Sequence, residues 1–419
     1  MRPLYDKLLS HISKSNSRFH MPGHNGNNLF CVDNKLDLTE LKDLDNLLSS
    51  SSCIYESEKY LAKAYSSNYS LMLTQGSTSA MQISMCYSIN QGYEIVSIGE
   101  MHSSFYNSIR LFSGEMISFS SIEEFNLNRK NIKKKCAIFI TSPNYFGQTK
   151  EVEKIQKDKE DILVLDAAHG AHFVYSKLLP QLPYENVDIF FVSFHKTMPA
   201  ITGASALFTQ DENIYLNLKY YRSMIHSTSP NYMTMASIDC ARDDFEKNGE
   251  LYYAKIKQVV DSYNGQIGGF NILNTDDFSR LVLQSDGVDA NEILEQLHDK
   301  GIDIEMAYLD KLVLILTPYN IDKLNKLEKA LEQTNKTKLE KKEFNKPLVK
   351  AKEIKSYKID FVDLEKSLGY VCACEIGIYP PSIPVVHSYE IIEEESLKVL
   401  IANKDHLFGL VNGKVAVLK

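Results

Sequence analysis

Hydrophobic residues along this chain gather in short continuous runs that alternate with longer stretches of helical spacing. Runs rich in Ile, Val and Phe, without polar residues at every second position, predict strands buried on both faces. Such strands belong to a mostly parallel sheet that helices cover on both sides. We therefore expect α/β architecture, with strands over residues 70–74, 94–98, 137–141, 162–166, 189–193 and 204–208.

The hydrophobic pattern changes after about residue 240. A loop over residues 264–269, a short strand over 280–283 and an amphipathic helix over 291–300 indicate a smaller α+β domain. The lysine-dense segment 335–355 is typical of a solvated helix or connector. The predicted organisation is thus an N-terminal arm, a large domain and a C-terminal small domain, over residues 1–55, 56–240 and 241–419.

Composition narrows the class of protein. The chain has 419 residues, 44% of them hydrophobic and 24% charged, which is ordinary for a globular protein. A net charge of −8 argues against nucleic acid as a partner and is compatible with a cationic small substrate. No run of about 18 apolar residues occurs, so we expect no membrane segment and a cytoplasmic location. We also expect no metal, because the seven scattered cysteines form neither a disulfide framework nor a zinc pattern.

Two candidate groups follow predicted strands near the middle of the sheet. Asp166 ends one strand and is followed by His169 and His172; Lys196 follows the next strand. The alternatives are a helix cap with a buried histidine, a metal site without a clear third ligand, and a solvent-exposed lysine. Asp166 and Lys196 lie about 30 residues apart, as expected of one crossover unit, so both side chains could face one crevice.

Two further groups follow other strands. The turn Gly76-Ser77-Thr78 begins a predicted helix over residues 77–90, and its N–H groups and hydroxyls could hold a phosphate. A simple helix cap is the alternative. His102 offers a flat side chain beyond another strand, and its alternative is a buried structural histidine.

These groups together meet the requirements of pyridoxal phosphate. That cofactor needs a lysine for a Schiff base, a carboxylate that keeps the ring nitrogen protonated, an anion cradle and a flat group beside the ring. Partial burial of Lys196 and a cationic neighbour such as His195 would lower the pKa of the lysine and favour its reactive amine.

The chain resembles the pyridoxal-phosphate decarboxylases for ornithine, lysine and arginine that have the aminotransferase-like fold (fold type I). The resembling segments occur in the family's order and cover nearly the whole chain: residues 19–24, 76–78, 100–104, 142–147, 166–172, 193–197, 227–230 and 379–384. The resemblance implies a large domain with a mostly parallel sheet and a smaller C-terminal α+β domain. It also implies the short form of the family, without an N-terminal wing domain.

The resemblance assigns roles to matching positions. Lys196 would carry the cofactor, Asp166 would pair with the ring nitrogen, and His169 would lie near the substrate carboxylate or the cofactor's phenolic oxygen. His102 would stack on the ring. The phosphate would be held by Gly76, Ser77, Thr78, Ser193 and His195, and by Thr228 and Ser229 of a neighbouring subunit. A homodimer or higher homo-oligomer with shared active sites is therefore implied.

The implied reaction is decarboxylation of a basic amino acid to a diamine or polyamine precursor. The family's substrate-facing glutamate position holds Cys374, with Glu375 next to it. A buried cationic substrate group needs an anionic partner, so this substitution leaves the substrate's side chain open. The domain that begins near residue 241 has no arginine after Arg280, so Arg280 or an earlier residue would have to bind the carboxylate in a transaminase.

Other activities also fit these residues. Transamination, elimination or decarboxylation of a non-basic amino acid would use the same cofactor. A catalytically silent homologue is a further alternative, against which the retention of Lys196, Asp166 and His102 argues.

Overall fold

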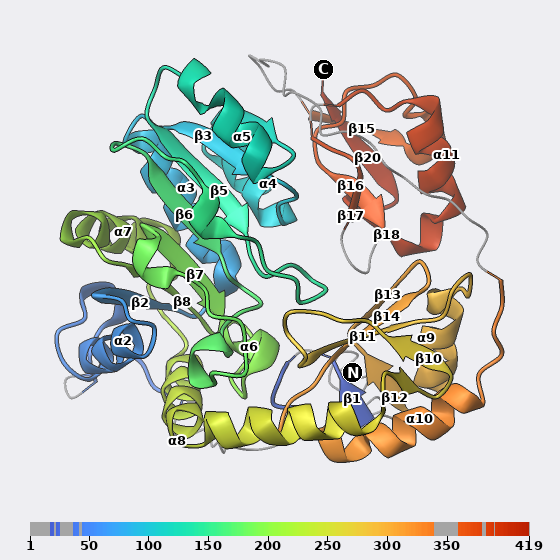
Figure 1. Ribbon diagram of the computed structural model, residues 1–419. Coiled ribbons are helices and arrows are strands. Elements are labelled where there is room, and N and C mark those ends of the chain that lie inside the picture. Colours follow the sequence, from blue (N-terminus) through green and yellow to red (C-terminus); the bar gives the residue numbers. More distant parts are fainter. Residues whose placement is uncertain are drawn as a thin grey trace. The chain divides into compact units, whose positions relative to one another are not determined.

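The computed structural model (Figure 1) describes residues 17–20, 22–25, 37–41, 44–338, 359–378, 383–388 and 390–418. It divides into two compact units, each built from three segments. The first comprises Met1–Ile83, Ser142–Glu153 and Val164–Lys341, and the second Ser84–Thr141, Lys154–Leu163 and Lys342–Lys419. The boundary predicted after residue 240 lies within the uninterrupted helix α8 (Tyr232–Ser262).

A seven-stranded sheet in the order β2-β8-β7-β6-β5-β3-β4 contains the six strands predicted for the large domain. Strands β6 and β7 are parallel, as are β3, β4 and β5, whereas β8 is antiparallel to both of its neighbours. The predicted α/β class with a mostly parallel sheet is confirmed. The strands are β2 (Tyr69–Leu73), β3 (Glu94–Ile98), β4 (Met116–Phe119), β5 (Cys136–Thr141), β6 (Ile162–Asp166), β7 (Ile189–Ser193) and β8 (Ser205–Thr209).

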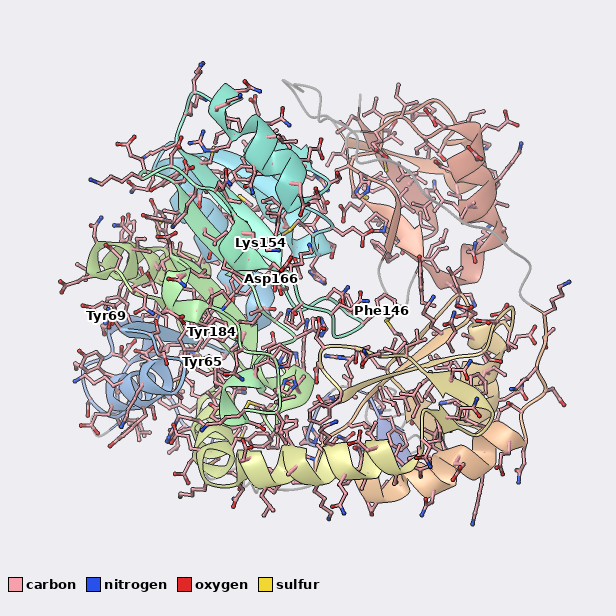
Figure 2. All side chains as sticks on the ribbon, viewed as in Figure 1. Tyr65, Tyr69, Phe146, Lys154, Asp166 and Tyr184 are labelled. Carbon is pink, nitrogen blue, oxygen red and sulfur yellow. The ribbon has the colours of Figure 1, made fainter. Side chains whose placement is uncertain are left out.

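Aromatic side chains pack around Tyr65, which follows helix α2 (Cys53–Ala64). The Tyr65 ring lies 4.6 Å from Phe208 and 5.9 Å from Tyr184, and Phe190 stacks on Phe208 with centroids 4.6 Å apart. Figure 2 labels Tyr65 and Tyr184 in this group. The Tyr65 hydroxyl donates to the carbonyl of Ala171, so the same core also holds the loop that follows β6.

Helices α7 and α8 of the first unit begin at side-chain caps. Asp211 accepts from the N–H of Ile214 at the start of α7 (Glu212–Ile225), and Asn231 accepts from that of Thr234 at the start of α8. Both contacts satisfy N–H groups that a helix start leaves without partners. The other helices of this unit are α6 (Phe194–Thr197), α9 (Ala290–Asp299) and α10 (Leu324–Glu332), while α3 (Gly76–Asn90) runs from the first unit into the second.

The first unit also contains a five-stranded antiparallel sheet in the order β13-β14-β11-β10-β9. Strand β11 carries Arg280 at its first residue, and a short strand near the N-terminus, β1, pairs in parallel with β12. These strands are β1 (Ser17–Phe19), β9 (Gln266–Ile267), β10 (Phe270–Ile272), β11 (Arg280–Gln284), β12 (Ile302–Ile304), β13 (Met306–Tyr308) and β14 (Lys311–Ile315).

The second unit has two three-stranded sheets, β15-β20-β19 and β17-β16-β18, in addition to strands β3, β4 and β5 of the large sheet. Aliphatic residues from both sheets and from α11 (Glu394–Ala402) form one core cluster. The remaining elements are α4 (Ser103–Leu111), α5 (Ile122–Asn128), β15 (Ile359–Asp363), β16 (Ile376–Ile378), β17 (Ile383–Val386), β18 (Leu407–Phe408), β19 (Leu410–Val411) and β20 (Lys414–Leu418). In neither unit is any described helix sufficiently long and apolar to cross a membrane.

Candidate active site

Asp166 and Lys196 lie at the ends of neighbouring parallel strands. Asp166 is the last residue of β6 (Figure 2), and Lys196 lies in α6, the single helical turn that directly follows β7. Because β6 and β7 are paired in parallel, their carboxyl ends meet at one edge of the sheet. The prediction that one crossover unit connects two strands that lie side by side is confirmed.

The carboxylate of Asp166 is buried, with the residue only 5% exposed. Within the described part of the chain it accepts one hydrogen bond, from the N–H of Ala168 at 3.0 Å. Burial raises the pKa of Asp166, and the charge of Lys196 acts in the opposite direction. A buried carboxylate with so few donors favours a cationic partner such as a protonated ring nitrogen.

The amine of Lys196 contacts His169, which comes from the loop after β6. Nζ lies 3.0 Å from His169 Nε2 and 5.9 Å from the centroid of the Tyr145 ring, and the rings of Tyr145 and His169 are 4.5 Å apart. Burial lowers the pKa of Lys196 to about 8. The resembling segment 142–147 contains Tyr145, but the sequence did not indicate its contact with His169.

The cationic neighbour of Lys196 is Arg280, and the expectation that His195 has this role is wrong. Burial lowers the pKa of His195 to about 4, so this imidazole is neutral near pH 7. Burial lowers the pKa of Lys196 most, and the guanidinium of Arg280 lowers it further. The charges of Asp166 and Glu305 act in the opposite direction. Arg280 Nη2 lies 3.1 Å from His169 Nδ1, a contact that residue spacing could not reveal.

Two of the predicted phosphate residues, Gly76 and His195, contact the segment that leads into β8. The N–H of Gly76 donates to Gly203 O at 2.8 Å, and His195 Nδ1 lies 3.1 Å from Ala204 O. The space where a Gly76 side chain would begin is open. Ser193 Oγ is buried without a hydrogen-bond partner among the described residues, as expected of a donor reserved for a ligand.

A second contact connects the phosphate turn with the predicted intersubunit segment. The N–H of Thr74 donates to His226 Nε2 at 3.0 Å, and Thr228 and Ser229, which follow shortly after His226, are exposed. Ser77 is half-buried and Thr78 exposed at the start of α3.

His102 belongs to the second unit, where it caps α4. Its Nδ1 accepts from the N–H of Ser104 at 3.1 Å and lies 2.9 Å from the Ser104 hydroxyl. His102 thus caps a helix, a role that the sequence did not indicate, and its ring is half-buried.

Glu375 is the more buried of the two candidate substrate residues. It is 4% exposed, its Oε1 lies 3.4 Å from His387 Nδ1, and its Oε2 has no partner among the described residues. Burial raises the pKa of Glu375, and although burial alone would lower the pKa of His387, the hydrogen bond and charge of Glu375 raise it. Cys374 Sγ instead donates to Gly409 O at 3.2 Å.

Part of the motif that located this region lies outside the described residues. Residues 379–382 of the resembling segment 379–384 belong to that part. Among the residues that the structure describes, no cluster of His, Cys, Asp and Glu could hold a metal ion.

These residues fit pyridoxal phosphate: a buried carboxylate at a strand end, a lysine with a lowered pKa, an open helix-start turn and a buried hydroxyl without a partner. The fold agrees with this cofactor. The structure of the constitutive lysine decarboxylase of E. coli superposes with a TM-score of 0.70 at 16% identity, covering 100% of this chain and 82% of the other. The chain thus has the fold of type I pyridoxal-phosphate enzymes, and its cofactor is pyridoxal phosphate.

Sequence comparison defines the family. The Orn/Lys/Arg decarboxylase major domain matches residues 2–117 and 112–318, so the chain belongs to the Orn/Lys/Arg decarboxylase family. The uncharacterized protein YaaO of Bacillus subtilis is 27% identical over 97% of this chain and 96% of its own length. The arginine decarboxylase of the same organism is 24% identical over 96% and 94%. The protein is a pyridoxal-phosphate-dependent amino-acid decarboxylase.

Proposed function

We propose that this protein decarboxylates a basic amino acid, which is arginine, lysine or ornithine, to the amine that serves polyamine biosynthesis. The observation that carries the proposal is the placement of Lys196 beside His169 and near buried Asp166 at adjacent strand ends. Relatives over nearly the full length of the chain are named arginine decarboxylases, which supports a basic substrate. We propose a cytoplasmic enzyme that works as a homodimer or higher homo-oligomer.

Bound pyridoxal phosphate would supply an electron-accepting ring for the bond that breaks at the substrate Cα. Asp166 would keep the ring nitrogen protonated, and Lys196 would hold the cofactor and later return a proton to Cα. His169 would orient the substrate carboxylate or the phenolic oxygen, and His102 would stack on the ring. Residues that would hold the phosphate are Gly76, Ser77, Thr78, Ser193 and His195, with Thr228 and Ser229 from a neighbouring subunit.

Glu375 is the proposed partner of the substrate's cationic side chain. Its buried Oε2 has no hydrogen-bond partner among the described residues, and burial raises its pKa, so an ammonium or guanidinium would satisfy it. Cys374 is the matched neighbouring control, because its thiol already donates a hydrogen bond to the carbonyl of Gly409.

The cofactor test is the visible absorbance of the purified protein and its trapping by borohydride. We expect covalent label on Lys196, detected by peptide mass spectrometry. A colourless protein, even after addition of pyridoxal phosphate, would overturn the proposal.

The substrate test is release of carbon dioxide from ornithine, lysine, arginine and the other amino acids. We expect release from one basic amino acid, and Glu375→Gln should lower kcat/KM for it by about 10²-fold, while Cys374→Ala changes it little. Keto-acid formation without carbon dioxide would indicate transamination, with Arg280 as carboxylate-binding residue.

A further inference from the structure

In the first unit, the side chains of Arg280, His169 and Lys196 form a continuous hydrogen-bonded line that ends at the lysine amine. Arg280, at the start of β11, approaches His169 Nδ1 with its Nη2 at 3.1 Å. The opposite ring nitrogen, Nε2, lies 3.0 Å from Lys196 Nζ. Arg280 and His169 are 2% and 3% exposed, so water does not compete strongly for either bond.

The chemistry of the donors defines the direction of both hydrogen bonds. A guanidinium has only N–H donors, so Arg280 donates and Nδ1 of His169 must accept. The neutral imidazole then carries its proton on Nε2, and that N–H points to Lys196 Nζ. An ammonium has no lone pair and cannot accept this bond, whereas a free amine can.

We propose that Arg280 is a positioning residue that fixes the tautomer of His169, so that His169 donates to the free amine of Lys196 and favours that form over the ammonium. The free amine is the form that attacks a carbonyl, so Arg280 would prepare Lys196 to take up the cofactor and to be regenerated after each turnover. The inference rests on the proposed role of Lys196 as the cofactor lysine.

The other charges around Lys196 are compatible with this arrangement. Burial and Arg280 lower its pKa, which is about 8, while Asp166 at the end of β6 and Glu305 between β12 and β13 raise it. His195, beside it in α6, is neutral because burial lowers its pKa to about 4. Tyr145 presents its ring to the amine at 5.9 Å.

A second buried network holds Arg280 against the loop of His169. Asp277 Oδ2 lies 3.1 Å from His172 Nε2, and the Ser279 hydroxyl donates to Asp277 Oδ1 at 2.6 Å. His172 belongs to the same loop as His169, and Asp277 and Ser279 lie within the three residues before Arg280. The segment before Arg280 and the loop of His169 are therefore joined by two contacts, Asp277 to His172 and Arg280 to His169. The first contact helps to keep the Arg280 to His169 distance short.

The packing around Gly147 restricts Arg280 further. A side chain at Gly147 would begin 2.8 Å from Arg280 Cβ, and the Asp277 N–H donates to Gly147 O at 3.0 Å. The backbone of residue 147 thus lies directly on the start of the arginine side chain.

The test measures Lys196 in the full-length chain after removal of the cofactor. Lysines compete for a trace amount of acetic anhydride at a series of pH values. Mass spectrometry of the peptide that contains Lys196 then gives the titration curve of the Lys196 amine. Arg280→Met should raise the apparent pKa of Lys196 by about one unit, and so lower its acetylation below that pKa roughly tenfold. Arg242→Met, which removes a guanidinium paired with Asp239 and Glu246, is the matched control and should not alter the curve.

A double-mutant cycle separates the proposed route from direct charge repulsion. In a His169→Phe background the effect of Arg280→Met should fall by more than half, because the imidazole that transmits it is absent. An equal effect in both backgrounds, or an unchanged Lys196 curve in Arg280→Met, would overturn the proposal. Arg280→Gln, which keeps an N–H donor but no charge, replaces Arg280→Met if that variant does not fold, and should retain a Lys196 curve closer to that of the unsubstituted chain.

Two outcomes distinguish this proposal from direct substrate binding by Arg280 and from failure of the proposed function. A raised KM in Arg280→Met with an unchanged Lys196 curve would mean that Arg280 binds the substrate directly, which overturns the proposal. Failure of borohydride to label Lys196 in the unsubstituted protein would contradict the proposed function, whereas the acetylation curves would still measure whether Arg280 acts on the lysine.

Discussion

Buried Glu375 and half-buried His387 form a titrating pair in the second unit. Burial lowers the pKa of His387, but the hydrogen bond and charge of Glu375, together with the charges of Glu390 and Glu100, raise it above 6.5. The folded state therefore binds this proton more tightly than the unfolded state, and the resulting stabilisation is present below pH 6.5 and lost as pH rises through the folded-state pKa. His387→Gln should lower the free energy of unfolding more at about pH 6 than at about pH 9, as measured by urea denaturation. An equal loss at both pH values would contradict this assignment.

Asp166→Asn tests the proposed contact with the ring nitrogen. The amide preserves the shape of the side chain but cannot hold a proton on a pyridine nitrogen by charge. We expect kcat to fall by about 10²-fold or more, with the cofactor absorbance retained. Loss of cofactor binding together with unfolding would instead indicate that Asp166 serves the fold.

The sequence was sufficient to place Asp166 and Lys196 at the ends of neighbouring strands, because both strands have a recognisable hydrophobic pattern. It was not sufficient for Arg280, which reaches His169 across 111 positions of the chain. Nor could it reveal that His195 is neutral, since that depends on burial and not on residue type. Contacts between distant segments and the degree of burial are properties of the folded chain alone.

A buried ion pair joins helices α2 and α7 to the start of the large sheet. Arg222 Nη1 lies 2.7 Å from Glu58 Oε1 and 3.2 Å from Met72 O in β2, and its Nη2 donates to Leu47 O at 2.6 Å. Arg222→Met leaves Glu58 buried and unpaired, so the free energy of unfolding should fall by about 3–5 kcal/mol. Lys247→Met, which breaks an exposed pair with Asp243 on α8, should cost about 1 kcal/mol or less. Chemical denaturation of both variants checks the contrast.

Gly203 positions the loop before β8 against the phosphate turn. Its φ is +95°, and a side chain there would begin 2.7 Å from Thr74 O. Gly203→Ala should therefore displace the hydrogen bond to Gly76 and weaken pyridoxal phosphate binding about tenfold or more, as measured by titration of absorbance. Gly287→Ala is the matched control, because Gly287 also has a positive φ but open space around it. Equal affinity in both variants would contradict the role of this contact.

Hydrophobic patterning located the strands of the large sheet within about one residue, except for β4. Most residues of β4 are only half-buried at the sheet edge, so they do not form a continuous hydrophobic run. The change of pattern near residue 240 did not mark the end of a helix, because the surface of α8 is polar over much of its length while its buried side continues to Ile256. In a long helix with one buried face, buried residues recur only every three or four positions, so the local composition does not show that the helix continues.

The exposed segment with Thr228 and Ser229 bears on assembly of the whole enzyme. Both residues follow His226, which accepts from the Thr74 N–H, and both are exposed in the single chain. We propose that they complete the phosphate site of a neighbouring subunit, so that each active site takes residues from two chains.

Mixed oligomers test this sharing directly. Lys196→Ala removes the proposed cofactor lysine of one chain, and a Thr228→Ala/Ser229→Ala chain removes the proposed intersubunit contacts. If the sites are shared within a dimer, co-expression yields hybrids in which one site combines an intact Lys196 with intact Thr228 and Ser229 from its partner. Random assortment then restores about a quarter of the activity of the unsubstituted enzyme, above that of either variant alone. Activity no higher than the sum expected from the separate variants would show that Thr228 and Ser229 act within their own chain.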